Sequence, residues 1–84
     1  MTIAFSEDAW KDYLFWQKTD KKTLQKINDL IKDCLRHPFQ GIGKPESLKF
    51  DMSGYLSRRI NAEHRLVYKS ENDQLVIIQC RYHY

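Results

Sequence analysis

The chain ends in Arg81-Tyr82-His83-Tyr84, which brings together residue types that can act on nucleic acid. Arginine binds phosphate through its planar fork, histidine can move a proton near neutral pH, and tyrosine can stack on a base. The segment follows the apolar run Leu75-Val76-Ile77-Ile78, which predicts a buried strand. A strand that continued to residue 84 would hold the three polar side chains at a fixed place on the surface.

Other residues complete a set that could cut RNA at its own 2′-hydroxyl. Such cleavage needs a base for the hydroxyl, an acid for the leaving oxygen, and cations for the charge that develops on the phosphate. Glu46 suits the base, and His83 suits the acid if a nearby carboxylate keeps it protonated. Arg65 and Lys49 suit the phosphate contacts. This scheme uses no cofactor and no metal, and the sequence has no His/Asp/Glu cluster with ligand spacing.

Each residue of this set also has an ordinary structural interpretation. A single histidine near a terminus is more often a surface residue than a catalyst. Glu46 and Lys49 are three residues apart and can form a surface ion pair, while Arg58 and Arg59 are typical of a solvated strand edge. Residue types alone therefore leave both a nuclease and a plain basic surface open.

Composition and charge narrow the class of protein. The chain has 84 residues, 42% of them hydrophobic and 30% charged, which is typical of one small globular domain over 1–84. Its net charge is +3, and residues 34–84, which hold all five arginines, carry the whole surplus. Neither a signal peptide nor an apolar stretch of about 20 residues is present, so we expect a cytoplasmic protein with two free, buried cysteines.

Two helices are predicted in the first half of the chain. Residues 3–5 suit a short strand, after which Ser6 can cap a helix that ends near Thr19. Asp20 can cap a second helix, whose apolar residues follow a 3.6-residue period until Pro38 stops it. Because the connection is short, we expect an antiparallel helical hairpin.

The second half predicts an antiparallel meander of strands over 47–50, 55–61, 65–69 and 74–84. The hairpin should cover one face of this small, mainly antiparallel sheet, which gives an α+β fold. Parity across a three-residue connection at 62–64 assigns the side chains of the central strands to two faces. The predicted core face holds Leu56, Ile60, Leu66 and Tyr68, and the opposite face holds Tyr55, Ser57, Arg59, Arg65 and Lys69.

Alternation in the last strand sets Val76, Ile78, Cys80 and Tyr82 against Gln79, Arg81 and His83. The uncovered face of the sheet is therefore expected to gather cationic side chains and a histidine. The expected members are Arg59, Arg65, Arg81 and His83, with Glu46 and Lys49 on the segment before the central strands.

The chain resembles the YoeB toxins, a family within the RelE/ParE superfamily of bacterial toxin–antitoxin systems. The similarity covers essentially the whole chain and is most specific in four stretches: KPESLK (44–49), GYLSRRI (54–60), EHRLVY (63–68) and CRYHY (80–84). Histidine is replaced by Phe50 and tryptophan by Leu56 relative to related sequences, and neither change removes a proposed catalytic group.

This resemblance implies a microbial-ribonuclease-like RelE/YoeB fold and a ribosome-dependent mRNA endoribonuclease. Such an mRNA interferase cleaves mRNA in the A site of the 70S ribosome and inhibits translation, leaving a 2′,3′-cyclic phosphate and a 5′-hydroxyl. The resemblance implies catalytic roles for Glu46 as general base, His83 as general acid and Arg65 as a transition-state contact. The residues to which it assigns substrate placement are Lys49, Arg59 and Tyr84.

The resemblance also implies partners. It implies a YefM-type antitoxin, whose C-terminal segment masks the active site and whose N-terminal part binds operator DNA, and a homodimer of the toxin. Two other functions remain open on the same fold: a ParE-like gyrase poison, and a module that binds RNA or ribosomes without cutting. The terminal Arg-Tyr-His-Tyr set, which gyrase poisons generally lack, favours the nuclease.

Overall fold

Two helix caps organise the N-terminal half of the protein, whose computed structural model describes residues 1–83. Strand β1 (Thr2–Phe5) leads into Ser6, whose hydroxyl accepts a 3.1 Å hydrogen bond from the third amide of α1 (Glu7–Thr19). Asp20 then caps α2 (Lys21–Arg36) by accepting from that helix's second and third amides, both at 3.1 Å. Both caps and both helices are as the sequence predicts.

The second half builds most of a five-stranded sheet with the order β1-β5-β4-β3-β2. Strand β1 runs parallel to β5, and every other neighbouring pair is antiparallel, so the predicted α+β fold with a mainly antiparallel sheet is confirmed. The elements after the helices are β2 (Glu46–Ser47), a 3-10 helix η1 (Phe50–Met52), β3 (Leu56–Arg59), β4 (Arg65–Glu71) and β5 (Gln74–Gln79).

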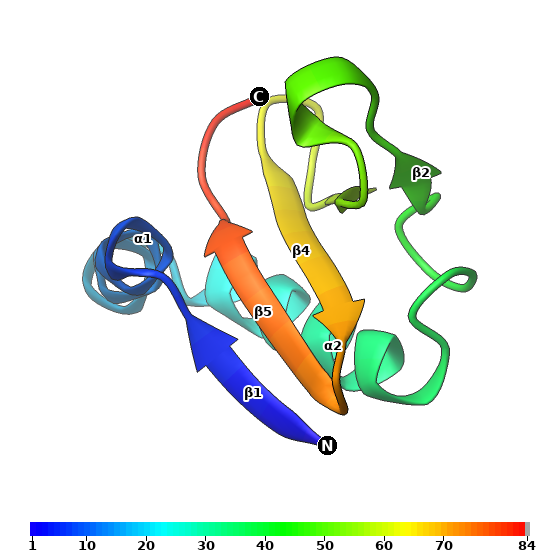
Figure 1. Ribbon diagram of the computed structural model, residues 1–84. Helices are drawn as coiled ribbons and strands as arrows, with labels where there is room; N and C mark the ends of the chain where they lie inside the picture. Colours follow the sequence, from blue (N-terminus) through cyan, green and yellow to red (C-terminus); the bar gives the residue numbers. More distant parts are fainter. Residues whose placement is uncertain (84) are drawn as a thin grey trace.

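The hydrophobic core lies between the helices and one face of the sheet. Helix α2 crosses behind β4 and β5 (Figure 1), and buries Ile27, Leu30 and Cys34 against them. The Tyr13 hydroxyl donates a 2.7 Å hydrogen bond to the Asn28 side chain, which ties the two helices together. Both cysteines are free and buried, as predicted. Within residues 1–83, no helix is long and apolar enough to cross a membrane.

The predicted assignment of the central strands to two faces is confirmed, although their register differs. Leu56, Ile60, Leu66 and Tyr68 all belong to the core. Arg59 is paired with Arg65, so the connection between β3 and β4 is two residues longer than the predicted 62–64. Because a shift of two residues does not change which face a side chain occupies, the assignment to the two faces is kept. The two arginines thus stand opposite each other on the uncovered face.

Three predicted strands are wrong in extent. That over 55–61 covers only Leu56–Arg59, and the other two end early where the backbone turns. Only Glu46 and Ser47 pair with β3, because Phe50 has a φ of +56° and begins a 3-10 turn instead of continuing a strand over 47–50. The last strand ends at Gln79, and Tyr82 has a φ of +67°, so the tail turns away from the strand direction. In Figure 1 this tail leaves β5 and approaches the loop before β4.

The predicted alternation of β5 is also wrong at its start. A bulge beside Val67 and Tyr68 places Ile78 between the two residues of β5 that pair with them. Leu75 and Ile77 are therefore fully buried, and Val76 and Ile78 are only half-buried. The sequence pattern carries no mark of the bulge, since all four residues are apolar.

Candidate active site

The uncovered face of the sheet carries a pocket of about 310 Å³. Its walls come from the segment around β2, the strands β3 and β4, and the C-terminal tail. Four of the predicted site residues line it together: Glu46, Arg59, Arg65 and His83. Lys44 and Ser57 complete the lining. The predicted substrate contact Tyr84 lies outside the described residues.

Sheet register explains why residues from three strands meet in this pocket. Glu46 is paired with Ser57, and Arg59, two residues further along β3, is paired with Arg65. Directly opposed side chains stand about 5 Å apart at Cβ, and diagonal neighbours about 7–8 Å apart. The carboxylate and the two guanidinium groups therefore project from one small patch of a rigid sheet.

A buried arginine, Arg58, fixes the loop that leads to Glu46. The prediction that Arg58 lies on a solvated strand edge is therefore wrong. Arg58 is fully buried and forms a 2.5 Å ion pair with Asp33 of α2. Its guanidinium also donates to the Tyr68 hydroxyl at 3.0 Å and to three carbonyls of the loop, those of residues 37, 40 and 42. The Arg59 amide donates to Gly43 O at 2.7 Å, so this loop is held along its length before it enters β2.

Arg65 is held by the tight loop that precedes it. Its Nη1 donates to the carbonyls of Asn61 at 2.7 Å and His64 at 3.0 Å, which orients the half-buried guanidinium. Arginine keeps its charge at any physiological pH. The site therefore presents a fixed cation toward the pocket rather than a mobile side chain.

His83 reaches the pocket because the tail before it is anchored at several points. The Cys80 amide donates to Asp12 at 3.1 Å, and its carbonyl accepts from the Trp16 indole at 2.8 Å. One residue before His83, the Tyr82 amide donates to His64 Nδ1 at 2.7 Å and the Tyr82 carbonyl accepts from the Arg65 amide at 3.0 Å.

The charge around the pocket favours an anionic ligand. Lys44, Arg59 and Arg65 contribute three cations, against the single carboxylate of Glu46. This suits a phosphate with an adjacent hydroxyl that the carboxylate can reach. Over residues 1–83, no three His, Cys, Asp or Glu side chains gather in a set that could hold a metal ion.

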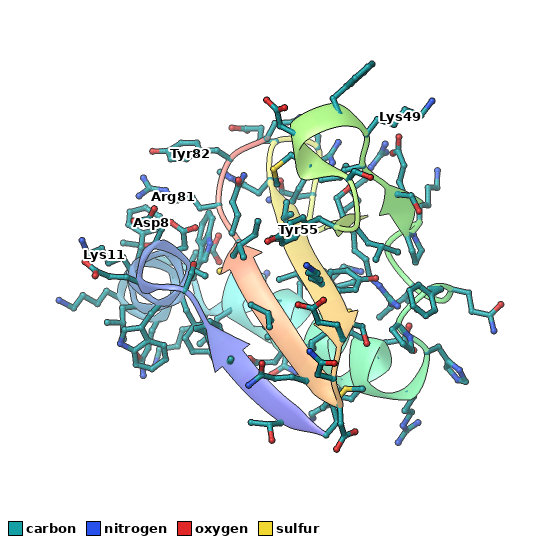
Figure 2. The ribbon with its side chains drawn as sticks, viewed as in Figure 1. Asp8, Lys11, Lys49, Tyr55, Arg81 and Tyr82 are labelled. Atoms are coloured by element: carbon teal, nitrogen blue, oxygen red, sulfur yellow. The ribbon has the colours of Figure 1, made fainter. Side chains whose placement is uncertain are left out.

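Lys49, another predicted substrate contact, lines a neighbouring hollow of about 360 Å³ that shares Glu46 with the main pocket. Phe50 stands beside it and is 92% exposed. Arg81, which was expected on the uncovered face, does not line the pocket. Its guanidinium lies 3.5 Å from the centre of the Phe15 ring, and Figure 2 shows Arg81 and Tyr82 projecting from the tail on the side of α1, away from Lys49.

Sequence reasoning missed three residues of this site. Lys44 and Ser57 both line the pocket. The sequence had suggested no role for Lys44, and it placed Ser57 on the uncovered face without one. His64 falls within the predicted connection at 62–64, yet its ring accepts a hydrogen bond from the Tyr82 amide of the tail. Only Ser57 had a usable signal, because strand parity already placed it on the same face as the two arginines.

The chain matches a family model described as "YoeB-like toxin of bacterial type II toxin-antitoxin system" over residues 5–84. Toxin YoeB of Escherichia coli K12 is 58% identical over 84 residues, with all of both chains covered. A YoeB/ParE toxin from Agrobacterium tumefaciens has a solved structure that is 53% identical and superposes with a TM-score of 0.96, again over all of both chains.

Staphylococcus aureus YoeB, 49% identical, has been solved as a dimer and in a heterotetrameric complex with YefM. The TM-scores are 0.93 and 0.92, and each match covers 100% of this chain and 98% of the other. YafQ from E. coli is 22% identical with a TM-score of 0.72, which indicates a shared fold.

A two-helix, five-stranded α+β fold with a cationic pocket on its uncovered face defines a small toxin of the RelE/YoeB type. Within that class, this chain belongs to the YoeB family of toxin–antitoxin systems.

Proposed function

We propose that this toxin is a ribosome-dependent mRNA endoribonuclease that cuts mRNA in the A site and thereby inhibits translation. The observation that carries the proposal is the gathering of Glu46, Arg59, Arg65 and His83 around one pocket. Together they provide a base, an acid and two phosphate-binding cations, which are the groups that cleavage at a 2′-hydroxyl requires.

In the proposed reaction, the Glu46 carboxylate removes the proton from the 2′-hydroxyl, and that oxygen attacks the adjacent phosphorus. The bond from phosphorus to the 5′-oxygen breaks, and His83 donates a proton to the departing oxygen. Arg65 and Arg59 stabilise the negative charge on the phosphoryl oxygens as the two bonds exchange. The products are a 2′,3′-cyclic phosphate and a 5′-hydroxyl.

Substrate placement is proposed for Lys49 and Tyr84 as well. Lys49 lies along a hollow that continues from Glu46, where a neighbouring phosphate of an extended strand can reach it. The role of Tyr84 rests on the family resemblance. The ribosome is proposed to supply the rest of the substrate's orientation, because the pocket of about 310 Å³ holds little more than one nucleotide's phosphate and sugar.

A YefM-type antitoxin and a second copy of the toxin are the proposed protein partners, and the cytoplasm, where ribosomes work, is the proposed location. The support for the antitoxin is the Staphylococcus aureus YoeB–YefM complex, and the support for the homodimer is the YoeB dimer from the same species.

Primer extension on a defined mRNA tests the proposal, with 70S ribosomes paused at a known codon. The wild-type protein should create a new 5′ end inside the A-site codon only when ribosomes are present, and Glu46→Gln should not. A gyrase supercoiling assay with the same preparations tests the alternative. Inhibited supercoiling with intact mRNA would replace the nuclease by a gyrase poison, and a ribosome footprint without new ends would indicate passive binding.

A further inference from the structure

His64 lies at the junction of three parts of the molecule. Its ring packs edge-on against Trp16 of α1, with the centroids 4.8 Å apart, and it lies 5.9 Å from the ring of Tyr82 in the tail. The residue itself belongs to the loop between β3 and β4, where its amide donates to the Asn61 side chain at 2.9 Å. A half-buried imidazole with contacts on both sides has little rotational freedom.

The hydrogen bond from this ring to the tail requires one protonation state. A backbone amide can only donate, so His64 Nδ1 must accept the 2.7 Å hydrogen bond from the Tyr82 amide. A neutral imidazole with its proton on Nε2 provides that acceptor, whereas an imidazolium has a proton on both nitrogens. Protonation of His64 therefore breaks this hydrogen bond, because two N–H donors, the Tyr82 amide and Nδ1–H of His64, would then face each other.

The same peptide segment positions His83. Tyr82 has a φ of +67°, an unfavourable conformation for a tyrosine that surrounding contacts must maintain. On its other side, the Tyr82 carbonyl accepts from the Arg65 amide at 3.0 Å and the Gln79 side chain at 3.2 Å. Tyr82, the residue before His83, is thus held at both ends: its amide by His64 and its carbonyl by the Arg65 amide.

We propose that neutral His64 is a positioning residue, which clamps the tail through the Tyr82 amide so that His83 stays at the pocket, and that protonation of His64 releases it. This inference rests on the proposed function for its effect on cleavage, while the clamp itself can be tested without any substrate. His64 does not line the pocket and is not proposed to touch RNA.

Charged groups surround the ring on every side that packs against it. Asp12 of α1 holds the Cys80 amide and faces His64, while Arg81 and His83 lie in the tail, and Glu63 and Arg65 flank His64 in the chain. Burial raises the pKa of Asp12, while its hydrogen bond with the Cys80 amide and the charge of Arg81 act in the opposite direction. Because Glu46 and His83 also exchange protons in the proposed reaction, the pH dependence of cleavage alone would not isolate His64.

Two substitutions distinguish the role of Nδ1 as hydrogen-bond acceptor from the packing role of the His64 ring. His64→Asn places an amide oxygen where Nδ1 lies and does not titrate, whereas His64→Leu keeps an apolar group against Trp16 and removes the acceptor. We expect single-turnover cleavage at pH 7.5 to fall about ten- to a hundredfold in His64→Leu, and to stay within about threefold of the wild type in His64→Asn.

The substrate-free measurement is NMR of the purified protein. ¹⁵N spectra should assign the Nε2–H tautomer to neutral His64. The protection factor of the Tyr82 amide, which compares its exchange rate with the intrinsic rate at the same pH, should fall when acidification protonates His64 in the wild type but should not change in His64→Asn. Thermal unfolding of each variant, which should be close to that of the wild type, shows that the fold is kept.

Each possible result bears on either the clamp, its effect on His83, or the proposed function. A Tyr82 amide whose exchange is the same in all three proteins, or a His64 that carries its neutral proton on Nδ1, overturns the clamp. If the NMR results hold but His64→Leu cleaves like the wild type, the clamp exists and does not position His83. Wild-type protein that never cleaves refutes the proposed function, and the NMR results then still decide the clamp.

Discussion

Arg58 and Arg59 are adjacent arginines on opposite faces of β3, and their replacement should have opposite consequences. Arg58 is fully buried and makes hydrogen bonds with the Asp33 carboxylate, the Tyr68 hydroxyl and three loop carbonyls. Arg59 is exposed and lines the pocket. We expect Arg58→Met to reduce the free energy of unfolding and Arg59→Met to reduce cleavage.

The magnitude follows from what Arg58→Met leaves behind. Asp33 loses its ion-pair partner, and the Tyr68 hydroxyl and three loop carbonyls lose their donor. Because the Asp33 side chain is 22% exposed and water can partly solvate it, the loss is closer to that of hydrogen bonds with a charged group, about 1.5–3 kcal/mol. A chain of 84 residues has a total stability of about 4–13 kcal/mol, so this single change removes a large part of it.

Guanidinium unfolding, followed by the fluorescence of buried Trp16, measures the loss. With a slope of about 2 kcal/mol per M, the midpoint should fall by about 0.7–1.5 M in Arg58→Met. Arg58→Lys keeps the charge but not the planar fork, so its midpoint should lie between those of Arg58→Met and the wild type. Arg59→Met should change the free energy of unfolding by no more than about 0.5 kcal/mol. Equal midpoints for Arg58→Met and Arg59→Met would refute the reasoning.

Three further results should follow from the structure. Glu46→Gln and His83→Gln should each lower single-turnover cleavage on programmed ribosomes by about 10²–10⁴-fold with almost unchanged unfolding midpoints, and full activity in either would remove it from the assigned role. Burial raises the pKa of Cys34 to about 11 and that of Cys80 to about 12, so both thiols should resist a disulfide reagent at pH 8 until the protein is unfolded, and rapid labelling of the folded protein would contradict the buried positions. The hydrogen bond with its arginine partner lowers the pKa of Asp33, so the stability from this carboxylate is present above about pH 4 and is lost as pH falls through the lower native value. The gap between the unfolding midpoints of the wild type and Asp33→Asn should therefore shrink below about pH 4, and a constant gap would contradict the pairing.

Local chemistry in the sequence was sufficient to predict the helices. Ser6 and Asp20 are cap residues with helical patterns directly after them, and both caps form in the structure. Strand parity likewise placed Arg59 and Arg65 on the uncovered face, because parity survives an error of two residues in the register. The caps depend on residues that are neighbours in the chain, and the faces of the strands depend only on whether a position is odd or even.

Features that depend on distant contacts were not predictable in this way. Arg58 was assigned to a solvated strand edge because of its charge, although it alternates with the core residues Leu56 and Ile60. Only Asp33 and the loop carbonyls explain its burial. The bulge in β5 lies within an apolar run that offers no residue to mark it. The turn at Tyr82 depends on contacts with His64 and the Arg65 amide, and the sequence does not show that these groups lie next to the tail.

The attack of a 2′-hydroxyl is the central chemical claim, and one substituted substrate tests it directly. An mRNA with a single 2′-deoxynucleotide on the 5′ side of the scissile phosphate would be bound to paused 70S ribosomes and incubated with the toxin, beside the all-ribose mRNA. We expect the all-ribose mRNA to yield a 2′,3′-cyclic phosphate by mass spectrometry and the deoxy-substituted mRNA to stay intact at that position. Cleavage of the deoxy-substituted mRNA at the same bond would contradict the roles given to Glu46 and His83.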